Sequence, residues 1–250
     1  MPRSVLRMRV GVYVDGFNLY FGARSVCGRG TPGWRWLDIR ALGERLIPLP
    51  WLDRGAYVDR VVYCTARVSG AEDRSSPADQ EVYLRALRAS GSVDWIAFGT
   101  FVTRAKVAPL AERDERGRPK LARARWPVQM RDANGADMPG ATFMVSYLDR
   151  EEKGTDVNLA THLLVDVLDE NVDAAIVISN DSDLALPIRV ARGNVPVGVV
   201  NPGTGPLAGR LRGLPFEGVK GHWWRRLEKA DYRACQMPKR VGALCRLEGW

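Results

Sequence analysis

The sequence predicts an α/β protein built on a mostly parallel, doubly wound sheet. Apolar, β-branched runs alternate along the chain with segments of helical periodicity, which is typical of parallel strands joined by helical crossovers. The first run, residues 8–14 (MRVGVYV), is continuously apolar, as expected for a strand buried on both faces. Residues 174–179 (AAIVIS) and 195–200 (VPVGVV) have the same character. We therefore expect a sheet with a strand order of about 3-2-1-4-5.

The remaining elements follow from the same periodicities. The expected strands are 8–14, 57–66, 93–102, 142–147, 174–179 and 195–200, and the expected helices begin near Phe17 and cover 37–47, 77–90, 156–169 and 183–192. The helix at 156–169 has the clearest pattern, with Thr155 as its expected N-cap. Its apolar face should contain Val157, Ala160, Leu163, Leu164, Val167 and Leu168.

Two basic segments interrupt or follow this core. Residues 103–140 contain nine Lys or Arg against five Asp or Glu, and four prolines, so we expect an insertion there. Residues 209–250 contain ten against four. We expect one domain over 1–205 and a basic C-terminal extension over 206–250, packed on or beside the core. Basic segments around an acidic core suit a polyanion, although an arginine-rich solvated surface explains the charge equally well.

Other classes of protein are disfavoured. No run of about 18 apolar residues is present, so we expect no membrane span. The four cysteines have no CxxC spacing and there are only two histidines, which argues against a zinc site or a disulfide framework. We therefore expect a cytoplasmic protein.

Acidic residues stand where two of the apolar strands end. Asp15 follows the first strand and Asp181 follows the strand at 174–179. In a doubly wound sheet these ends meet at the switch point, where ligands bind. Each residue also has a simpler explanation, because Asp15 and Asp181 or Asp183 can cap a helix and Asp156 lies in a first helical turn.

Together the carboxylates favour a divalent cation, which would relieve their mutual repulsion. Asn18 lies about one helical turn after Asp15 and can face the same cleft. Asn18 and Ser179 can hydrogen-bond a carboxylate or a metal-bound water. Lys153 is either a phosphate contact or a solvated lysine in a charged turn.

Three stretches, VYVDGFNLYF, EEKGTDVNLATHLL and VISNDSDLALPIR, closely resemble the NYN-domain family, which is related to the PIN-like nucleases, and the closing CQMP…LEGW resembles the end of one bacterial branch. The resemblance implies a three-layer PIN-like fold and a ribonuclease site that depends on Mg²⁺ or Mn²⁺. It implies a catalytic and metal-binding set of Asp15, Asp156, Asp181 and Asp183, with Asn18 beside it. The expected substrate contacts are Lys153, Ser179, Asn180 and Ser182. Asn180 stands where the family often has glycine.

The function expected from these features is a divalent-metal-dependent endoribonuclease. Two alternatives stay open: a non-catalytic RNA- or partner-binding module, and a metal-dependent DNA nuclease or phosphatase. RNA is the expected partner, with DNA and a homodimer left open and no membrane contact. Tryptophans among the arginines can stack unpaired bases, whereas Trp223 and Trp224 are more typical anchors of a tail on the core.

Overall fold

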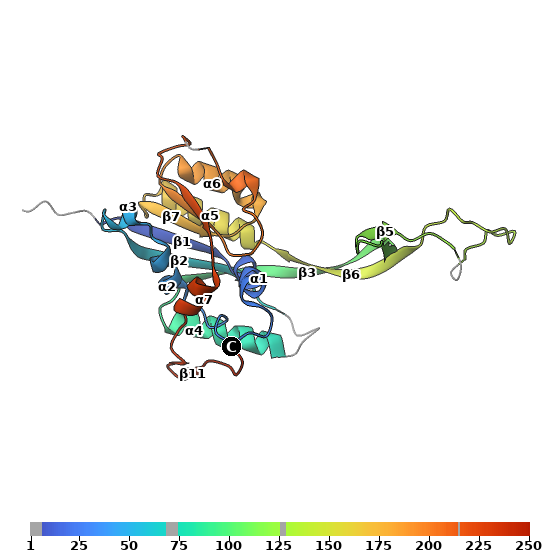
Figure 1. Cartoon of the computed structure of the whole chain (residues 1–250), viewed down its shortest axis with the longest axis horizontal. Helices are drawn as coiled ribbons and strands as arrows, with labels where there is room; N and C mark the ends of the chain where they lie inside the picture. The colour runs from blue at the N-terminus through green and yellow to red at the C-terminus, as the bar shows by residue number, and fades with distance from the viewer. Residues whose placement is uncertain (1–6, 69–74, 126–128, 215) are drawn as a thin grey trace, which may run out of the picture. The chain divides into compact units, whose positions relative to one another are not determined.

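A seven-stranded sheet in the order β6-β3-β2-β1-β7-β8-β9 is the centre of the fold (Figure 1). The structure is a computed structural model that describes residues 7–68, 75–125, 129–214 and 216–250. The sheet strands are β1 (Arg9–Asp15), β2 (Tyr57–Ala66), β3 (Trp95–Pro109), β6 (Met144–Lys153), β7 (Ala174–Ile178), β8 (Val197–Asn201) and β9 (Trp223–Arg226). β1 pairs with β2 and β7 in parallel, and so do β2 with β3, β7 with β8, and β8 with β9. The sheet is therefore mostly parallel, as the sequence predicts.

Helices cover both faces of this sheet. They are α1 (Gly16–Cys27), α2 (Ile39–Leu46), α3 (Leu49–Leu52), α4 (Ser75–Ala89), α5 (Thr155–Leu168), α6 (Ala185–Arg192) and α7 (Lys229–Ala234). Alternate residues of β1 divide the core, because successive strand side chains point to opposite faces. Val12 and Val14 belong to the cluster that contains α1, α2 and α4, whereas Tyr13 belongs to the cluster with α5 and α6. The fold is thus a three-layer α/β arrangement.

The strand order brings the acidic strand ends together. The five main strands expected from the sequence stand as β3-β2-β1-β7-β8, so β1 and β7 are hydrogen-bonded neighbours. α1 follows β1 and packs on one face, whereas α5 and α6 belong to the other. The winding therefore reverses between β1 and β7, and this is the point at which doubly wound sheets bind ligands.

α5 differs from its expected form at its start and on its buried face. Its N-cap is Gly154, at φ 94°, and not Thr155. A left-handed backbone favours glycine, which has no Cβ to clash. Val157 is 67% exposed, whereas Leu159 is fully buried. The helix is rotated from the expected orientation because the sheet beneath it, and not its own composition, selects the buried stripe.

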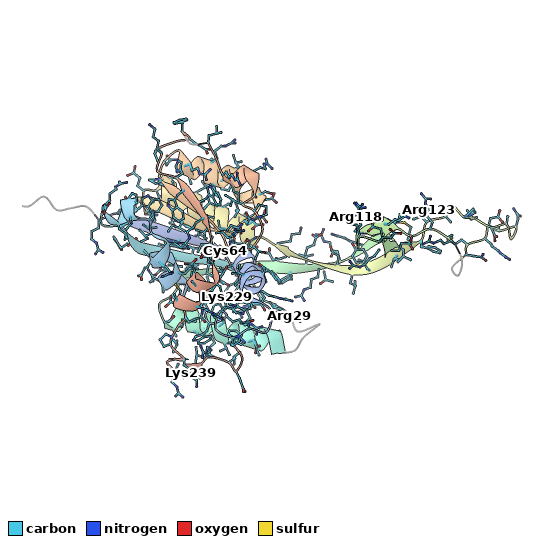
Figure 2. The ribbon with its side chains drawn as sticks, viewed as in Figure 1. Arg29, Cys64, Arg118, Arg123, Lys229 and Lys239 are labelled. Carbon is cyan, nitrogen blue, oxygen red and sulfur yellow. The ribbon has the colours of Figure 1, made fainter. Side chains whose placement is uncertain are left out.

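The basic insertion forms a second compact unit, Phe101–Glu151. β3 extends to Pro109, and the strand expected at 142–147 is instead β6 (Met144–Lys153). A small antiparallel sheet joins β4 (Ala111–Arg113) to β5 (Pro119–Leu121). Much of its charge is paired internally in the ion pairs Arg118–Asp114, Arg125–Glu112 and Arg131–Asp137. Figure 2 labels Arg118 and Arg123 on this unit.

The C-terminal segment adds β9 to the edge of the sheet. Trp223 packs against Trp51, with ring centroids 5.8 Å apart, as expected for an anchor, whereas Trp224 is 48% exposed. Buried Asp231 ties α7 to the core through ion pairs with Arg45 and Arg225. The chain then ends in the short antiparallel pair β10 (Arg240–Val241) and β11 (Leu244–Cys245).

The tryptophans that stand among arginines and can stack bases include Trp34, Trp36 and Trp51, which are instead core residues, 2%, 0% and 4% exposed. Trp126 lies outside the described residues. None of the described helices is both long and apolar enough to cross a bilayer.

Candidate functional site

Asp15 is the last residue of β1 and caps α1. Its carboxylate accepts hydrogen bonds from the backbone N–H of Asn18 and the hydroxyl of Ser179, both at 3.0 Å. The residue is 6% exposed. Burial raises the pKa of the Asp15 carboxyl above its usual value, although these two hydrogen bonds oppose the rise. Asp15 is therefore a helix cap, which is one of the two explanations offered by the sequence, and it also lines the cavity described below.

The segment after β7 holds Asp181 beside Asp15. The Ser179 hydroxyl oxygen accepts a hydrogen bond from the backbone N–H of Asp181 at 3.1 Å. Asp181 in turn accepts from the N–H of Asp183 at 2.9 Å and caps the short 3-10 helix η1 (Ser182–Leu184). Asp183 is exposed. Ser179 therefore connects the two strand ends through one hydroxyl group.

Asp156 enters the same region from the first turn of α5. Burial is the main reason that its pKa rises to about 6, and the carboxylates of Asp15, Asp181 and Glu152 add to the rise. Glu152 was not predicted as a site residue. It accepts hydrogen bonds from the backbone N–H and the hydroxyl of Thr155. The signal for it was the pair of glutamates just before Lys153, a charged turn in which the sequence analysis considered only Lys153.

Asn18 and Asn180 are hydrogen-bonded to each other, and Asn180 is also hydrogen-bonded to the loop after β8. The Asn18 side-chain oxygen accepts from the backbone N–H of Asn180 at 3.0 Å. The Asn180 side chain donates to the Pro206 carbonyl at 3.0 Å and accepts from the Ala208 N–H at 2.8 Å. These contacts hold the loop after β8 against the end of β7. Asn180 thus has a positioning role that the sequence did not reveal.

These residues surround one cavity of about 440 Å³. It is lined by Asp15, Phe17, Asn18, Phe21, Gly22, Ser25, Glu152, Thr155, Asp156, Asn180, Asp181, Asn201, Gly203, Thr204 and Gly205. Five expected site residues are brought together here: Asp15, Asn18, Asp156, Asn180 and Asp181. Four others do not line it: Lys153, Ser179, Ser182 and Asp183. The loop at 201–205 was missed, although its NPGTG sequence at a strand end was a usable signal.

The lining is acidic, with four carboxylates and no lysine or arginine among the described residues that form it. Its oxygen atoms suit a ligand that donates hydrogen bonds or carries positive charge. In the described ranges, no group of three or more His, Cys, Asp or Glu is placed so that it could hold a metal ion. The four-aspartate metal site expected from the sequence is therefore not supported, since Asp183 lies outside the cavity. Binding of Mg²⁺ or Mn²⁺ is itself untested and stays a prediction.

Cys64 stands beside this site without the properties of a nucleophile. It pairs with Asp15 across β1 and β2 and is fully buried. Figure 2 labels its position. Burial raises the pKa of the Cys64 thiol to about 12, and the carboxylates of Asp15 and Asp156 contribute. A thiol that stays protonated is a poor nucleophile, so Cys64 serves as a core residue.

Comparison with known proteins relates the chain to an enzyme. It is 28% identical over 253 aligned positions to 6-hydroxy-3-succinoylpyridine 3-monooxygenase of Pseudomonas putida, covering 93% of this chain and 71% of that protein. No family model matches the chain. A crystal structure of a protein of unknown function from Vibrio parahaemolyticus aligns with a TM-score of 0.46 and 14% identity, covering 92% of this chain and 98% of the other.

The similarity to a monooxygenase overturns the function expected from the sequence. The prediction of a metal-dependent endoribonuclease was wrong, because the relative's name describes an oxidoreductase and not a hydrolase. The ribonuclease and hydrolase descriptions are corrected with it, and the two alternative functions gain no support. The motif reasoning failed because carboxylates at a switch point are compatible with several chemistries.

Proposed function

We propose that the chain is an oxidoreductase that binds a small hydroxylated aromatic heterocycle in the acidic cavity at the ends of β1 and β7. The similarity to a monooxygenase extends over 93% of the chain and supports the reaction class. The relative's name describes a substrate with a pyridine ring and a hydroxyl group. We take this substrate as the first one to test.

The observation that carries the proposal is the composition of the cavity wall. Carboxylates of Asp15, Glu152, Asp156 and Asp181 face a space of about 440 Å³, within the range of small-molecule sites. A hydroxypyridine offers an O–H or a ring N–H to such acceptors. Phe17 and Phe21 supply aromatic surface to the same wall. The ring and its polar hydrogens therefore suit this lining. The carboxylate of the succinoyl chain has to point out of the cavity, since no lysine or arginine among the described residues lines it.

A monooxygenation places one oxygen atom of O₂ on a ring carbon and reduces the other to water. It consumes two electrons and two protons from a donor. Carbon 3 of the ring in 6-hydroxy-3-succinoylpyridine carries the succinoyl group and no hydrogen, so a hydroxyl formed there replaces that acyl group, which takes up water and leaves as a carboxylic acid. In our proposal a cavity carboxylate accepts the hydrogen bond of the ring hydroxyl and orients the ring. Asp156 lies at a helix start and its side chain is half-buried, so it can exchange a proton with solvent.

The test measures binding and turnover separately. Purified protein is titrated with 6-hydroxy-3-succinoylpyridine by calorimetry. It is then assayed for O₂ uptake and substrate loss with reduced nicotinamide coenzyme, with and without added flavin. We expect saturable binding that Asp156→Asn weakens and Asp169→Asn, at the far end of α5, does not. Absence of both binding and oxygen-dependent substrate loss would contradict the proposal.

The remaining predictions from the sequence keep their standing as predictions. Membership of the NYN-domain family, contact with RNA or DNA, and a homodimer are untested. A cytoplasmic location is our proposal for the compartment, since all four cysteines are free in the structure.

A further inference from the structure

A second cavity, of about 710 Å³, is lined in part by the same loop at 201–205. Its wall includes Arg212, Trp224, Arg225, Arg226 and Glu228. It shares Asn201, Thr204 and Gly205 with the acidic cavity. Its chemistry differs from its neighbour's, because three arginines and an indole stand beside a single carboxylate, that of Glu228. Nothing in the proposed reaction assigns a role to it.

The strand geometry of β9 presents an aromatic ring and a cation together. Side chains two residues apart on a strand share a face, and Trp224 and Arg226 alternate with the more buried Trp223 and Arg225. Trp223 is packed over Gly198, where an added Cβ would lie 2.2 Å from its ring. Trp224 has no such packing and is 48% exposed. The more buried face of β9 therefore anchors the strand through Trp223, and the exposed face contributes Trp224 and Arg226 to the cavity wall, which Arg225 also lines.

The two exposed arginines of this wall have hydrogen-bonding capacity left. Arg212 lies over the Trp224 ring, with its guanidinium carbon 5.4 Å from the centroid, and has no ion pair with another described residue. Arg226 donates one hydrogen bond, at 2.7 Å, to the Thr204 carbonyl. A guanidinium has five N–H donors, so donors of both arginines are available to a ligand. Arg225 differs, because Asp231 occupies it at 2.6 Å.

The loop at 201–205, which lines both cavities, is held in place by side-chain hydrogen bonds. The Asn201 side chain is 1% exposed; it donates to the Gly205 carbonyl at 2.8 Å and accepts from the Gly203 N–H at 2.9 Å. The bond from Arg226 to Thr204 attaches the same loop to β9. A loop held by a buried amide at one point and a guanidinium at another gives both cavities a preformed boundary.

We propose that this second cavity binds an anionic ligand that carries a flat aromatic ring, with the ring against Trp224 and the anionic group on Arg212 and Arg226. Arginine presents paired N–H donors that match carboxylate and phosphate oxygens, and an exposed indole stacks planar rings. The anion is either a phosphate, as in a mononucleotide, or a carboxylate on an aromatic ring. The proposal is independent of the monooxygenase reaction, because binding alone tests it.

The experiment titrates the purified chain by calorimetry at low ionic strength with AMP, nicotinate, adenosine and inorganic phosphate. AMP represents a ring with a phosphate and nicotinate a ring with a carboxylate, whereas adenosine and phosphate each lack one half. We expect AMP or nicotinate to bind saturably and more tightly than either half. Which of the two binds more tightly identifies the anion.

Variants separate this site from general attraction to a basic surface. Arg212→Gln should lower the affinity for the probe that binds about tenfold or more, since a charge-assisted contact is lost. The matched control is Arg210→Gln, an exposed arginine outside the cavity wall, and it should change affinity less than about twofold. Trp224→Leu should lower the affinity for the probe that carries a ring and leave the weak binding of inorganic phosphate unchanged.

Three results would overturn the proposal. The first is no saturable binding of either AMP or nicotinate. The second is equal weakening by Arg212→Gln and Arg210→Gln, which shows only a diffuse charge effect. The third is phosphate binding as tight as that of AMP, which shows that the ring contributes nothing to the affinity. Circular dichroism of each variant confirms that the fold is retained.

Discussion

The hydroxyl of Ser179 donates to the carboxylate of Asp15 at 3.0 Å and accepts from the backbone N–H of Asp181 at 3.1 Å. This fully buried serine joins residues 166 positions apart at the ends of adjacent strands. Because the group that it serves is a buried carboxylate, the contact matters for both the stability and the electrostatics of the acidic cavity.

Removing that hydroxyl should therefore cost stability. Ser179→Ala removes the donor to one carboxylate oxygen of Asp15, while the other oxygen still accepts from Asn18, and it removes the acceptor of the Asp181 N–H. We expect a loss of about 1–3 kcal/mol in the free energy of unfolding near neutral pH. Urea denaturation measures it. Ser182→Ala is the matched control, because the Ser182 side chain bonds no described residue and does not line the cavity. A loss no larger in Ser179→Ala than in this control contradicts the inferred role.

Asp156 should make the fold less stable as the pH rises. Its pKa is raised to about 6 in the folded chain, chiefly by burial, above the ordinary value of about 3.9 in the unfolded chain. Between these values the folded chain binds more protons than the unfolded one, so stability falls as pH rises from about 4 to 6 and stays reduced above that window.

Replacing Asp156 by a neutral residue should restore the stability that is lost as the pH rises. We expect Asp156→Asn to stabilise the chain by about 1 kcal/mol near pH 7, after allowance for solvent screening, and much less near pH 4. Thermal unfolding at both pH values measures the difference, with Asp169→Asn as an exposed control on the same helix. An equal effect at the two pH values shows that the charge of Asp156 is not the cause.

The rate of the proposed reaction should depend on the same group. If ionised Asp156 accepts the proton of the ring hydroxyl, kcat/KM rises with pH through about 6 and levels off above it. Replacement by asparagine should remove this limb while leaving any limb from the substrate's own titration. A profile that keeps its rise near pH 6 in Asp156→Asn assigns the proton transfer to another residue.

Asn180 should control the mobility of the loop that lines both cavities. Asn180→Ala removes one donor to Pro206 and one acceptor for Ala208, and we expect faster amide hydrogen exchange across residues 203–208. Asn194→Ala is the comparison, since Asn194 makes one exposed side-chain hydrogen bond to Val190. Unchanged exchange in the loop of Asn180→Ala shows that other contacts hold it.

The local pattern of apolar residues was enough to predict the strands of the central sheet. Continuously apolar runs such as MRVGVYV and AAIVIS predict buried parallel strands because both of their faces must leave water, and β1 and β7 lie there. It also located Asp15 and Asp181 at strand ends. The face of α5, its Gly154 cap and the extent of β3 and β6 were not readable, because each depends on what packs against it.

By itself, the sequence determined that a doubly wound α/β core would bring acidic side chains to the ends of two of its strands, since hydrophobic periodicity is local. Only the tertiary structure decided which of them share a cavity. It placed Asp156 beside Asp15 and Asp181, added Glu152 and the loop at 201–205, and left Lys153 and Asp183 outside. The physical reason is that a cavity is formed by long-range hydrogen bonds, such as those of Ser179 and Asn180, which no local pattern encodes.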